Sequence, residues 1–397
     1  MPIDTRQDLH DDYLDIIMGP SHPAMHGTIQ MRVLLDGETI KSCDVEPGFL
    51  HRAFEKECED HRWNQNFPYT DRLNYVSPII NNVGYAMAVE KLCGIEVPVR
   101  GQYLRVLLSE MTRITDHLTC LAAVMMELGA FSAFLYFIKA RELYYDLLES
   151  VTGARVTYSW CRVGGHRWDI PEDFPAGLRQ AIPETRRILK EIHGLFDHNR
   201  IFLDRVVGIG AVSQEDALSY GITGPWLRAT GIGYDVRKAH SYMAYDEFDF
   251  DIPTGETGDN WDRYVVRMEE MEQSLRILEQ GVGNIPEGPI SIDDPRFTLP
   301  EKKDVYNSIE GTINHFKLVF DGIHPPAGEA YSYVEGANGE LGFYVVSDGG
   351  NKPVKCRCRP PCFPNVAAMG EILEGYMLAD IIPTFGAANM IGGEMDR

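Results

Sequence analysis

The stretch "CLAAVMMELGAFSAFLYFI", residues 120–138, decides between two different folds. An apolar run of this length can cross a lipid bilayer, or it can lie in the core of a helix bundle. Glu127 and Gly129 interrupt the run, and the sequence has no second window of this kind to pack against it in lipid. We therefore expect buried bundle helices here and no transmembrane span.

Helical spacing of apolar residues extends to either side of this window. It runs from about residue 75 to residue 150 with few helix breakers. Residues 185–207 and 262–281 have the pattern of two further long amphipathic helices, and Asp259 or Asp262 supplies a start signal for the second. The centre of the molecule is therefore predicted to be a helix bundle.

Two stretches have the pattern of β-hairpins. Residues 28–46 are rich in strand formers around the turn pair Asp36-Gly37, and residues 330–350 repeat this pattern around Asn338-Gly339. A helix is expected in residues 49–63, between the first hairpin and the bundle. The predicted fold class is α+β and mainly helical, with a central helix bundle and small antiparallel sheets at its edges.

Three regions are expected along the chain. Residues 1–55 form an N-terminal antiparallel β region, residues 56–285 the bundle, and residues 286–397 a C-terminal α+β region. A stretch rich in proline and glycine, 283–300, marks the second boundary, and the end of the chain, 364–397, is expected to be a short helix and a Gly-rich tail.

Composition limits the partners. Lys and Arg number 37 against 59 Asp and Glu, a net charge of −22. Nucleic acids and anionic lipid surfaces repel such a chain, so any membrane contact should pass through a partner protein. The N-terminus lacks the apolar core of a signal peptide, and eight cysteines without a disulfide-like rhythm indicate a reducing cytosol.

Motifs for several cofactors are missing. None of the three Gly-x-Gly stretches follows a strand and opens a helix, and there is no Gly-x4-Gly-Lys-Ser/Thr loop, so NADH and ATP binding by this chain is not expected. No Cys-x2-Cys occurs either. Cys356, Cys358 and Cys362 fall short of four metal ligands, and we expect free thiols and no metal.

Glu127 is the titratable residue that the sequence makes most conspicuous. An ionised carboxylate in so apolar a stretch is costly unless it finds a partner or reaches solvent near Gly129. A histidine is the partner that can also hand over a proton. The stretch "GPSHPAMHG", residues 19–27, offers His22 and His26 on a segment in which Pro23 disfavours a helix.

A second polar group lies on the same predicted helix. Glu110, Arg113, Asp116 and His117 are spaced three and four residues apart and form one stripe. We interpret Glu110 and Asp116 as parts of a salt-linked packing stripe.

Ordered motifs along nearly the whole chain resemble one family, the hydrogenase-like quinone-site subunit of respiratory complex I (the D subunit, or 49-kDa family). The motifs include "GPSHPAMHG", "GFLHRAFEKECEDH", "PYTDRLNYVS", "YGITGPWLRATGI" and the terminal "GGEMDR". The resemblance implies a fold like that of the large subunit of nickel–iron hydrogenases. Because both metal-binding Cys-x2-Cys pairs of those enzymes are missing, nickel chemistry is excluded, and in the family the emptied cavity takes the quinone headgroup.

The resemblance also implies the site residues. His26 and Tyr75 would donate hydrogen bonds to the two quinone carbonyls, and Glu127 stands where the family has an aspartate that partners the histidine. Hydrogen-bond donors at these oxygens orient the quinone, stabilise the developing negative charge and supply protons. These three residues are the expected catalytic set.

Further residues are expected around the quinone and its electron donor. His22, Met25 and Arg72 would line the quinone site, and Arg52 would lie near a 4Fe-4S cluster carried by the neighbouring subunit. Arg167 occupies a position where many relatives have a histidine facing that cluster.

The implied function is the quinone-reduction site of a proton-translocating NADH:quinone oxidoreductase, with ubiquinone or menaquinone as substrate. The implied partners are the small cluster-bearing B subunit, the C subunit, the membrane quinone-channel H subunit and the I subunit. The implied location is peripheral, on the cytoplasmic side of the cell inner (plasma) membrane. Two alternatives stay open: the large subunit of an energy-converting hydrogenase, and a structural assembly subunit without quinone contact.

Overall fold

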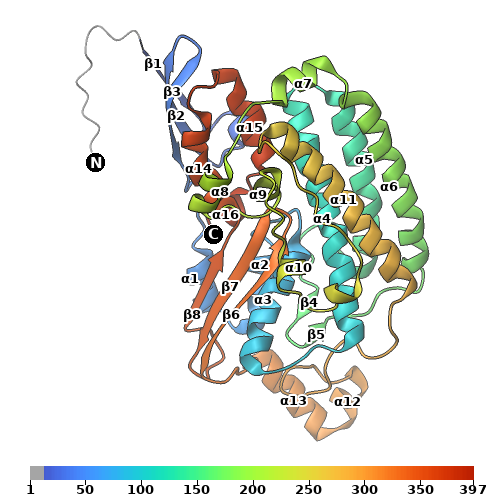
Figure 1. Ribbon diagram of the computed structural model, residues 1–397. Coiled ribbons are helices and arrows are strands. Elements are labelled where there is room, and N and C mark those ends of the chain that lie inside the picture. The colour runs from blue at the N-terminus through green and yellow to red at the C-terminus, as the bar shows by residue number, and fades with distance from the viewer. Residues whose placement is uncertain (1–12) are drawn as a thin grey trace.

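The computed structural model describes residues 13–397 and shows a bundle of long helices with small sheets beside it (Figure 1). Four helices extend along one side of the molecule, and a fifth, α3, lies between them and the second sheet. The five helices are α3 (Pro78–Cys93), α4 (Val99–Glu127), α5 (Phe131–Thr152), α6 (Phe174–Phe196) and α11 (Asn260–Gly283).

The apolar window at 120–138 is divided between two of these helices. Helix α4 ends at Glu127 and α5 begins at Phe131, and Gly129 makes the turn between them with φ +84°. Only glycine adopts this left-handed conformation without strain. Between residues 13 and 397, no helix combines the length and apolarity that crossing a bilayer requires. The prediction of bundle helices is confirmed.

The first sheet contains the N-terminal hairpin. Strands β2 (Gln30–Asp36) and β3 (Thr39–Glu46) pair as predicted, and β1 (Leu14–Met18), which the sequence did not indicate, adds an antiparallel edge strand. The prediction of the turn was wrong by one residue: Asp36 pairs with Thr39, so Gly37 and Glu38 form the turn.

The second sheet contains the other predicted hairpin and packs against α3. Strands β6 (Gly328–Gly336) and β7 (Gly339–Ser347) are joined by Ala337 and Asn338, one residue earlier than predicted, because Gly336 already pairs with Gly339. Strand β8 (Lys355–Arg359) completes the sheet beside β7.

The single long helix predicted for residues 185–207 is two helices. Helix α6 ends at Phe196, and α7 (Arg200–Val206) begins after a break. The side chain of Asn199 accepts hydrogen bonds from two backbone N–H groups at the start of α7. This capping favours a new helix over continuation of the old one.

The C-terminal region is more ordered than the predicted short helix and Gly-rich tail. It forms α14 (Cys362–Leu373), α15 (Ile381–Ala388) and α16 (Gly392–Met395), which are largely buried. A Cβ atom on Gly393 would lie 2.5 Å from the carbonyl oxygen of Arg72, so the glycine permits close packing.

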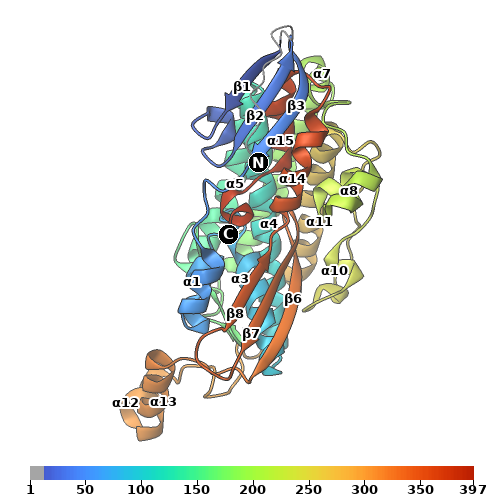
Figure 2. The same cartoon turned by 90° about the vertical axis from the view of Figure 1, so that its left-hand side faces the viewer.

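A helical hairpin projects from the lower end of the molecule (Figure 2). It comprises α12 (Lys302–Asn307) and α13 (Ile309–Phe320), which follow the predicted boundary stretch and were not predicted themselves. The remaining α-helices are short: α1 (Phe54–Asp60), α2 (Phe67–Thr70), α8 (Gln214–Tyr220), α9 (Pro225–Ala229) and α10 (Val236–Ala239).

The N-terminal and C-terminal regions share one apolar core. Met31 and Val33 of β2 are fully buried in the same cluster as Val366 and Met369 of α14, and β3 packs against α14. Burial of this shared apolar surface stabilises both regions together. The division into three regions stays a prediction.

Candidate functional site

The segment that carries His26 leads from β1 into β2. A short 3-10 helix, Pro23–Met25, is followed by His26 at φ 54° and Gly27 at φ 75°. The left-handed conformation of His26 is uncommon for a residue with a side chain. It directs the chain back into the sheet at β2, and His26 remains exposed.

His26 contacts Glu127. Its Nε2 atom lies 2.8 Å from Oε1 of Glu127, with 42% of the histidine side chain and 8% of the glutamate side chain exposed. The carboxylate therefore satisfies its need for a partner with an imidazole that solvent can reach. The expected contact between these two residues is present, whereas the role expected of them in catalysis stays a prediction.

Helix α15 covers the other side of this pair. The ring of Phe385 meets the His26 ring edge-on at 5.9 Å, and Gly386 lies directly against Oε2 of Glu127, where a Cβ would come within 2.7 Å. Oε2 itself has no hydrogen-bond partner among residues 13–397. A glycine at 386 thus leaves room for the carboxylate at the end of α4.

Tyr75 lies in the short connection between α2 and α3, with 49% of its surface exposed. Partial burial of its hydroxyl raises the pKa of Tyr75, the charges of Asp116 and Cys362 raise it further, and the Arg52 guanidinium opposes them. The phenol is therefore a hydrogen-bond donor at neutral pH.

Asp116 fixes the segment around Tyr75. Its Oδ2 atom accepts hydrogen bonds from Asn74 Nδ2 and Ser77 Oγ, both at 2.7 Å, and its Oδ1 atom accepts one from Asn389 Nδ2 at 2.8 Å. Asp116 is fully buried, so this clamp is shielded from water. The prediction of a salt-linked stripe is confirmed for Glu110, which pairs with Arg113 at 3.2 Å. It is wrong for Asp116, whose partners are the loop residues named above.

Arg52 and Arg72 are both exposed and touch each other. Arg52 donates from Nη2 to the backbone carbonyl of Arg72 at 2.8 Å. The end of the chain supports the segment before Arg52, because the Asp396 carboxylate accepts hydrogen bonds from the N–H groups of Gly48 and Leu50 at 3.0 and 2.7 Å. The structure therefore brings three expected site residues close together: Arg52, Arg72 and Tyr75.

In this structure, His22 caps a short helix and Met25 packs in the core. The Nδ1 atom of His22 accepts a hydrogen bond from the backbone N–H of Ala24 at 3.2 Å, which caps the 3-10 helix. Met25 is fully buried in the core beneath the loop. Contact between the Met25 side chain and a ligand would require the loop to move, and the expected ligand roles of both residues stay predictions.

No cavity described for residues 13–397 is lined by both His26 and Tyr75. A surface cavity of about 460 Å³ lies nearby, next to Arg52. Its lining comes from the loop before α1, from α1, β8 and α14, and from the chain end, and includes His51, Phe363 and Arg397.

His166, next to Arg167, is buried and not positioned for the cluster-facing role that the resemblance implies for a histidine at position 167. It stacks on Trp160 at 3.7 Å and lies 2.9 Å from the Gly101 carbonyl through Nε2. Burial and the nearby Arg105 charge hold the pKa of His166 well below its usual range, so it is neutral. Arg167 is exposed and lies over the ring of Trp168.

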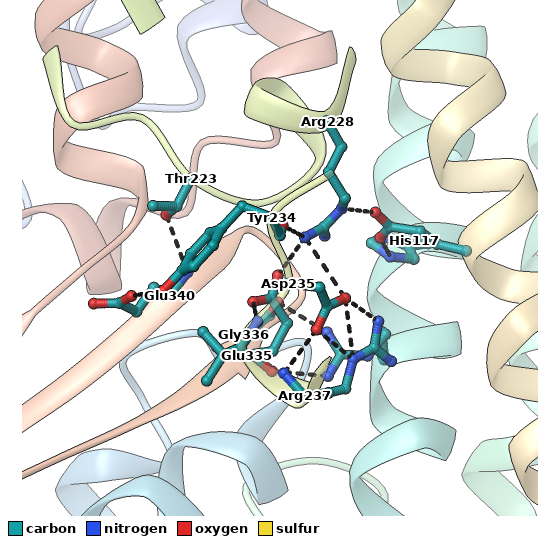
Figure 3. A network of polar contacts seen from close by, with 12 residues as sticks. His117, Thr223, Arg228, Tyr234, Asp235, Arg237, Glu335, Gly336 and Glu340 are labelled. Atoms are coloured by element: carbon teal, nitrogen blue, oxygen red, sulfur yellow. Dashed lines mark hydrogen bonds and ion pairs between the residues drawn. The ribbon is translucent and has the colours of Figure 1, made fainter. Parts of the chain in front are cut away.

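A network of buried charges lies behind the site, between α4, α9, α11 and β6 (Figure 3). Arg228 donates from Nε to Glu270 at 2.6 Å and from Nη1 to Glu335 at 2.8 Å. His117 completes it with a 2.9 Å contact from Nε2 to Glu270. Burial penalises ionised Glu270, but Arg228 and then His117 outweigh that cost and hold its pKa well below the usual range. Sequence reasoning missed Arg228, Glu270 and Glu335, because their contacts join distant segments.

Glu394 is a further buried acid that the sequence did not single out. Burial raises its pKa to about 8, and the charge of Asp116 adds to this, whereas the backbone N–H of Cys362 donates to its Oε1 atom at 3.2 Å and opposes the rise. Glu394 is therefore mostly protonated at pH 7. The sequence feature that could have indicated Glu394 is the terminal motif that contains it.

Metal binding finds no support in the part of the chain that the structure describes. Across residues 13–397, no group of three or more His, Cys, Asp or Glu side chains is arranged to hold a metal ion. The buried thiols of Cys356, Cys358 and Cys362 are free. The side chains that the structure places at the candidate site are an imidazole paired with a carboxylate, a phenol, and two guanidinium groups.

Comparison with known proteins gives the class to which this fold and site belong. The family model described as "Respiratory-chain NADH dehydrogenase, 49 Kd subunit" matches residues 127–397. The chain belongs to this family, as its motifs indicated.

Named relatives cover almost the whole chain. The first of them, the D subunit (form 1) of NADH-quinone oxidoreductase from Sorangium cellulosum, is 54% identical over 98% of this chain and 97% of its own length. The D subunit of the enzyme from Myxococcus xanthus is 54% identical over 96% of this chain and 92% of its own length. A fused C/D subunit from Bdellovibrio bacteriovorus is 48% identical over 98% of this chain and 70% of its own length.

Proposed function

We propose that this chain forms the quinone-reduction site of a complex I-type NADH-quinone oxidoreductase. The observation that carries the proposal is the 2.8 Å contact between His26 and Glu127, in which a buried carboxylate holds a solvent-accessible imidazole. Membership of the 49-kDa family and the names of the relatives support the reaction class. The hydrogenase-like origin of the fold is part of the proposal.

The chemistry asks for two protons and two electrons for each quinone. A 4Fe-4S cluster of the neighbouring B subunit would supply the two electrons, with Arg52 as the residue of this chain expected near it, and each carbonyl oxygen gains one proton. His26 supplies one proton and Tyr75 the other, because imidazolium (pKa about 6.5) and phenol (pKa about 10) are acidic enough to protonate a reduced quinone. Both donors are then reprotonated, and the Glu127 carboxylate holds the His26 imidazole in place through their 2.8 Å contact.

The cavity is proposed to close only in the assembled complex. Tyr75 and His26 are both exposed in this chain, and the segment of Arg52 and Arg72 lies beside Tyr75. The B subunit would supply the missing wall, and the membrane-embedded H subunit would admit the lipid quinone. The fused relative supports the C subunit as a partner, and the I subunit completes the set. The chain would lie peripherally on the cytoplasmic side of the membrane.

The experiment compares Tyr75→Phe and His26→Ala in intact membranes. We expect NADH:quinone reductase activity to fall at least about tenfold in each, since positioned acid–base groups contribute two or more orders of magnitude. NADH oxidation by ferricyanide, which bypasses the quinone site, should be retained. Tyr306→Phe and His198→Ala, on exposed surfaces, are the matched controls and should leave both rates unchanged.

The same experiment separates the alternatives. Near-normal quinone reduction in both site variants would contradict the proposal and support a structural assembly subunit. Nickel above trace amounts in the purified complex would support an energy-converting hydrogenase, an interpretation that the missing cysteine pairs oppose.

A further inference from the structure

A small cavity lies against α15. Arg267 contributes to its wall, and the other contributions come from α4, α7, α11 and α15. The remaining lining residues are mostly apolar: Leu121, Val124, Phe202, Val206, Asn260, Tyr264, Pro383 and Ala387. The space corresponds to roughly one water-sized molecule.

Arg267 directs unused hydrogen-bond donors at this space. Its side chain is 1% exposed, and its Nη1 atom donates to the Arg263 carbonyl at 3.2 Å. Nε and Nη2 have no hydrogen-bond partner within residues 13–397. The two polar side chains beside it are occupied elsewhere, since Asn260 bonds Thr384 and Tyr264 bonds Asp197.

A second buried guanidinium, that of Arg263, adds to the positive charge near the cavity. Arg263 is one turn earlier on α11 and fully buried, lies 3.8 Å from the Trp226 ring, and donates to backbone carbonyls and to Asn260. Burial lowers the pKa of Arg263 to about 9, and the neighbouring charge of Arg267 adds to this. Two like charges one turn apart destabilise a helix unless an opposite charge compensates them.

The acids near this pair are committed to other partners. Glu270, one turn after Arg267, bonds Arg228 and His117, and Asp116 clamps the segment of Tyr75. Asp259 caps the start of α11. Asp259 and Asp262, at the start of α11, favour the charged form of Arg263 from a distance, but among the residues described neither Arg263 nor Arg267 forms an ion pair with a carboxylate. Arg267 therefore lacks a direct counter-charge in this part of the chain.

We propose that the cavity at Arg267 binds one small monovalent inorganic anion. A water molecule could accept the free N–H groups but would leave the charge uncompensated, and an uncompensated charge among apolar walls is expensive. An anion satisfies the donors and the charge together. The apolar walls strengthen the attraction, because the local dielectric is low.

The position of this site connects it to the candidate quinone site. Pro383 and Ala387 of α15 line the cavity, while Phe385 and Gly386, on the same helix, contact His26 and Glu127. A bound anion therefore supports α15. This consequence rests on the proposed function, whereas anion binding itself does not.

Anomalous scattering from bromide tests the site directly. Crystals of the assembled complex are prepared with chloride replaced by bromide, and data are collected at the bromine absorption edge. We expect a peak in the cavity within hydrogen-bond distance of Arg267 Nε and Nη2. Crystals that show bromide at other positions and none in this cavity would overturn the proposal.

Variants test whether Arg267 is the residue that binds the anion. Arg267→Met should abolish the peak, Arg267→Lys should keep it at reduced occupancy, and Arg200→Met, on an exposed side chain, should leave it unchanged. A peak that persists at full height in Arg267→Met would overturn the assignment. If Arg267→Met does not assemble, the wild-type result and Arg267→Lys still decide it.

Activity tests the connection through α15. Quinone reduction by the wild-type complex should fall several-fold when gluconate replaces chloride and recover with bromide, while NADH:ferricyanide activity stays constant. An unchanged rate beside a clear bromide peak would overturn the connection and leave the anion site standing. Failure of the quinone proposal would leave the bromide result unaffected.

Discussion

Oε1 of Glu127 lies 2.8 Å from Nε2 of His26, although the two residues are 101 positions apart in the chain. The glutamate stands at the last residue of α4, and the histidine stands on the loop between the first two strands. The pairing brings together a side chain from the helix bundle and a side chain from a loop of the first sheet. It is the relationship on which the account of catalysis depends.

Glu127→Gln removes the charge of this pair and keeps its shape. We expect quinone reductase activity in membranes to fall about tenfold, because the amide cannot stabilise a protonated imidazole. Glu127→Asp should retain intermediate activity, because its carboxylate is shorter by one methylene. Glu215→Gln, on an exposed position, is the control. Full activity in Glu127→Gln would show that the charge at Glu127 is not needed.

Asp116→Asn weakens the clamp around Tyr75. We expect the KM for quinone to rise several-fold with a smaller change in kcat, because Tyr75 would be misplaced while its phenol remains available. In the double variant Asp116→Asn, Tyr75→Phe, the two effects should not add, since both act through the same hydroxyl. Additive losses would indicate that Asp116 acts only on overall stability.

Glu394 predicts a pH dependence of stability. Its pKa is raised to about 8 from an ordinary value of 4.5, so its contribution is full below about pH 4.5 and is lost as pH rises toward and through 8. Glu394→Gln mimics the protonated form. The thermal midpoint of the wild-type complex should therefore fall relative to that of the variant as pH rises from 4.5 to 8, by an amount worth a few kcal/mol. Parallel pH profiles for the two proteins would contradict the assignment.

Arg228→Met leaves two buried carboxylates, Glu270 and Glu335, without their common partner. Removing one partner of a buried ion pair costs about 3–5 kcal/mol, so the complex should melt at a clearly lower temperature or fail to assemble. Arg200→Met, whose side chain is 92% exposed, should change the stability by less than about 0.5 kcal/mol. Equal melting of the two variants would contradict a structural role for the network.

Local patterns predicted much of this fold. Apolar spacing and turn residues predicted the bundle helices and both hairpins. Each turn was misplaced by one residue, because the last paired residues of the two strands are not the ones that the turn motif alone indicates. The break between α6 and α7 depends on the Asn199 cap, and the order of residues 362–395 depends on close packing of glycines such as Gly393. Such contacts between distant segments leave no periodic signal.

The site was predictable to a similar extent. Glu127 was conspicuous because of its apolar surroundings, and the loop motif and family resemblance supplied His26 and Tyr75. Asp116 was misinterpreted as the partner of an arginine, because its real partners, Asn74, Ser77 and Asn389, come from other segments. Hydrogen-bond partners that come from distant segments can be identified only from the three-dimensional structure.

Photo-crosslinking with a short-chain quinone analogue tests the central claim most directly. The assembled complex is labelled in membranes, with and without excess natural quinone, and the labelled peptides of this chain are mapped. We expect labels within residues 19–28 and 69–78 that excess quinone suppresses. Labels confined to other segments, with these two peptides unmodified, would contradict the central claim.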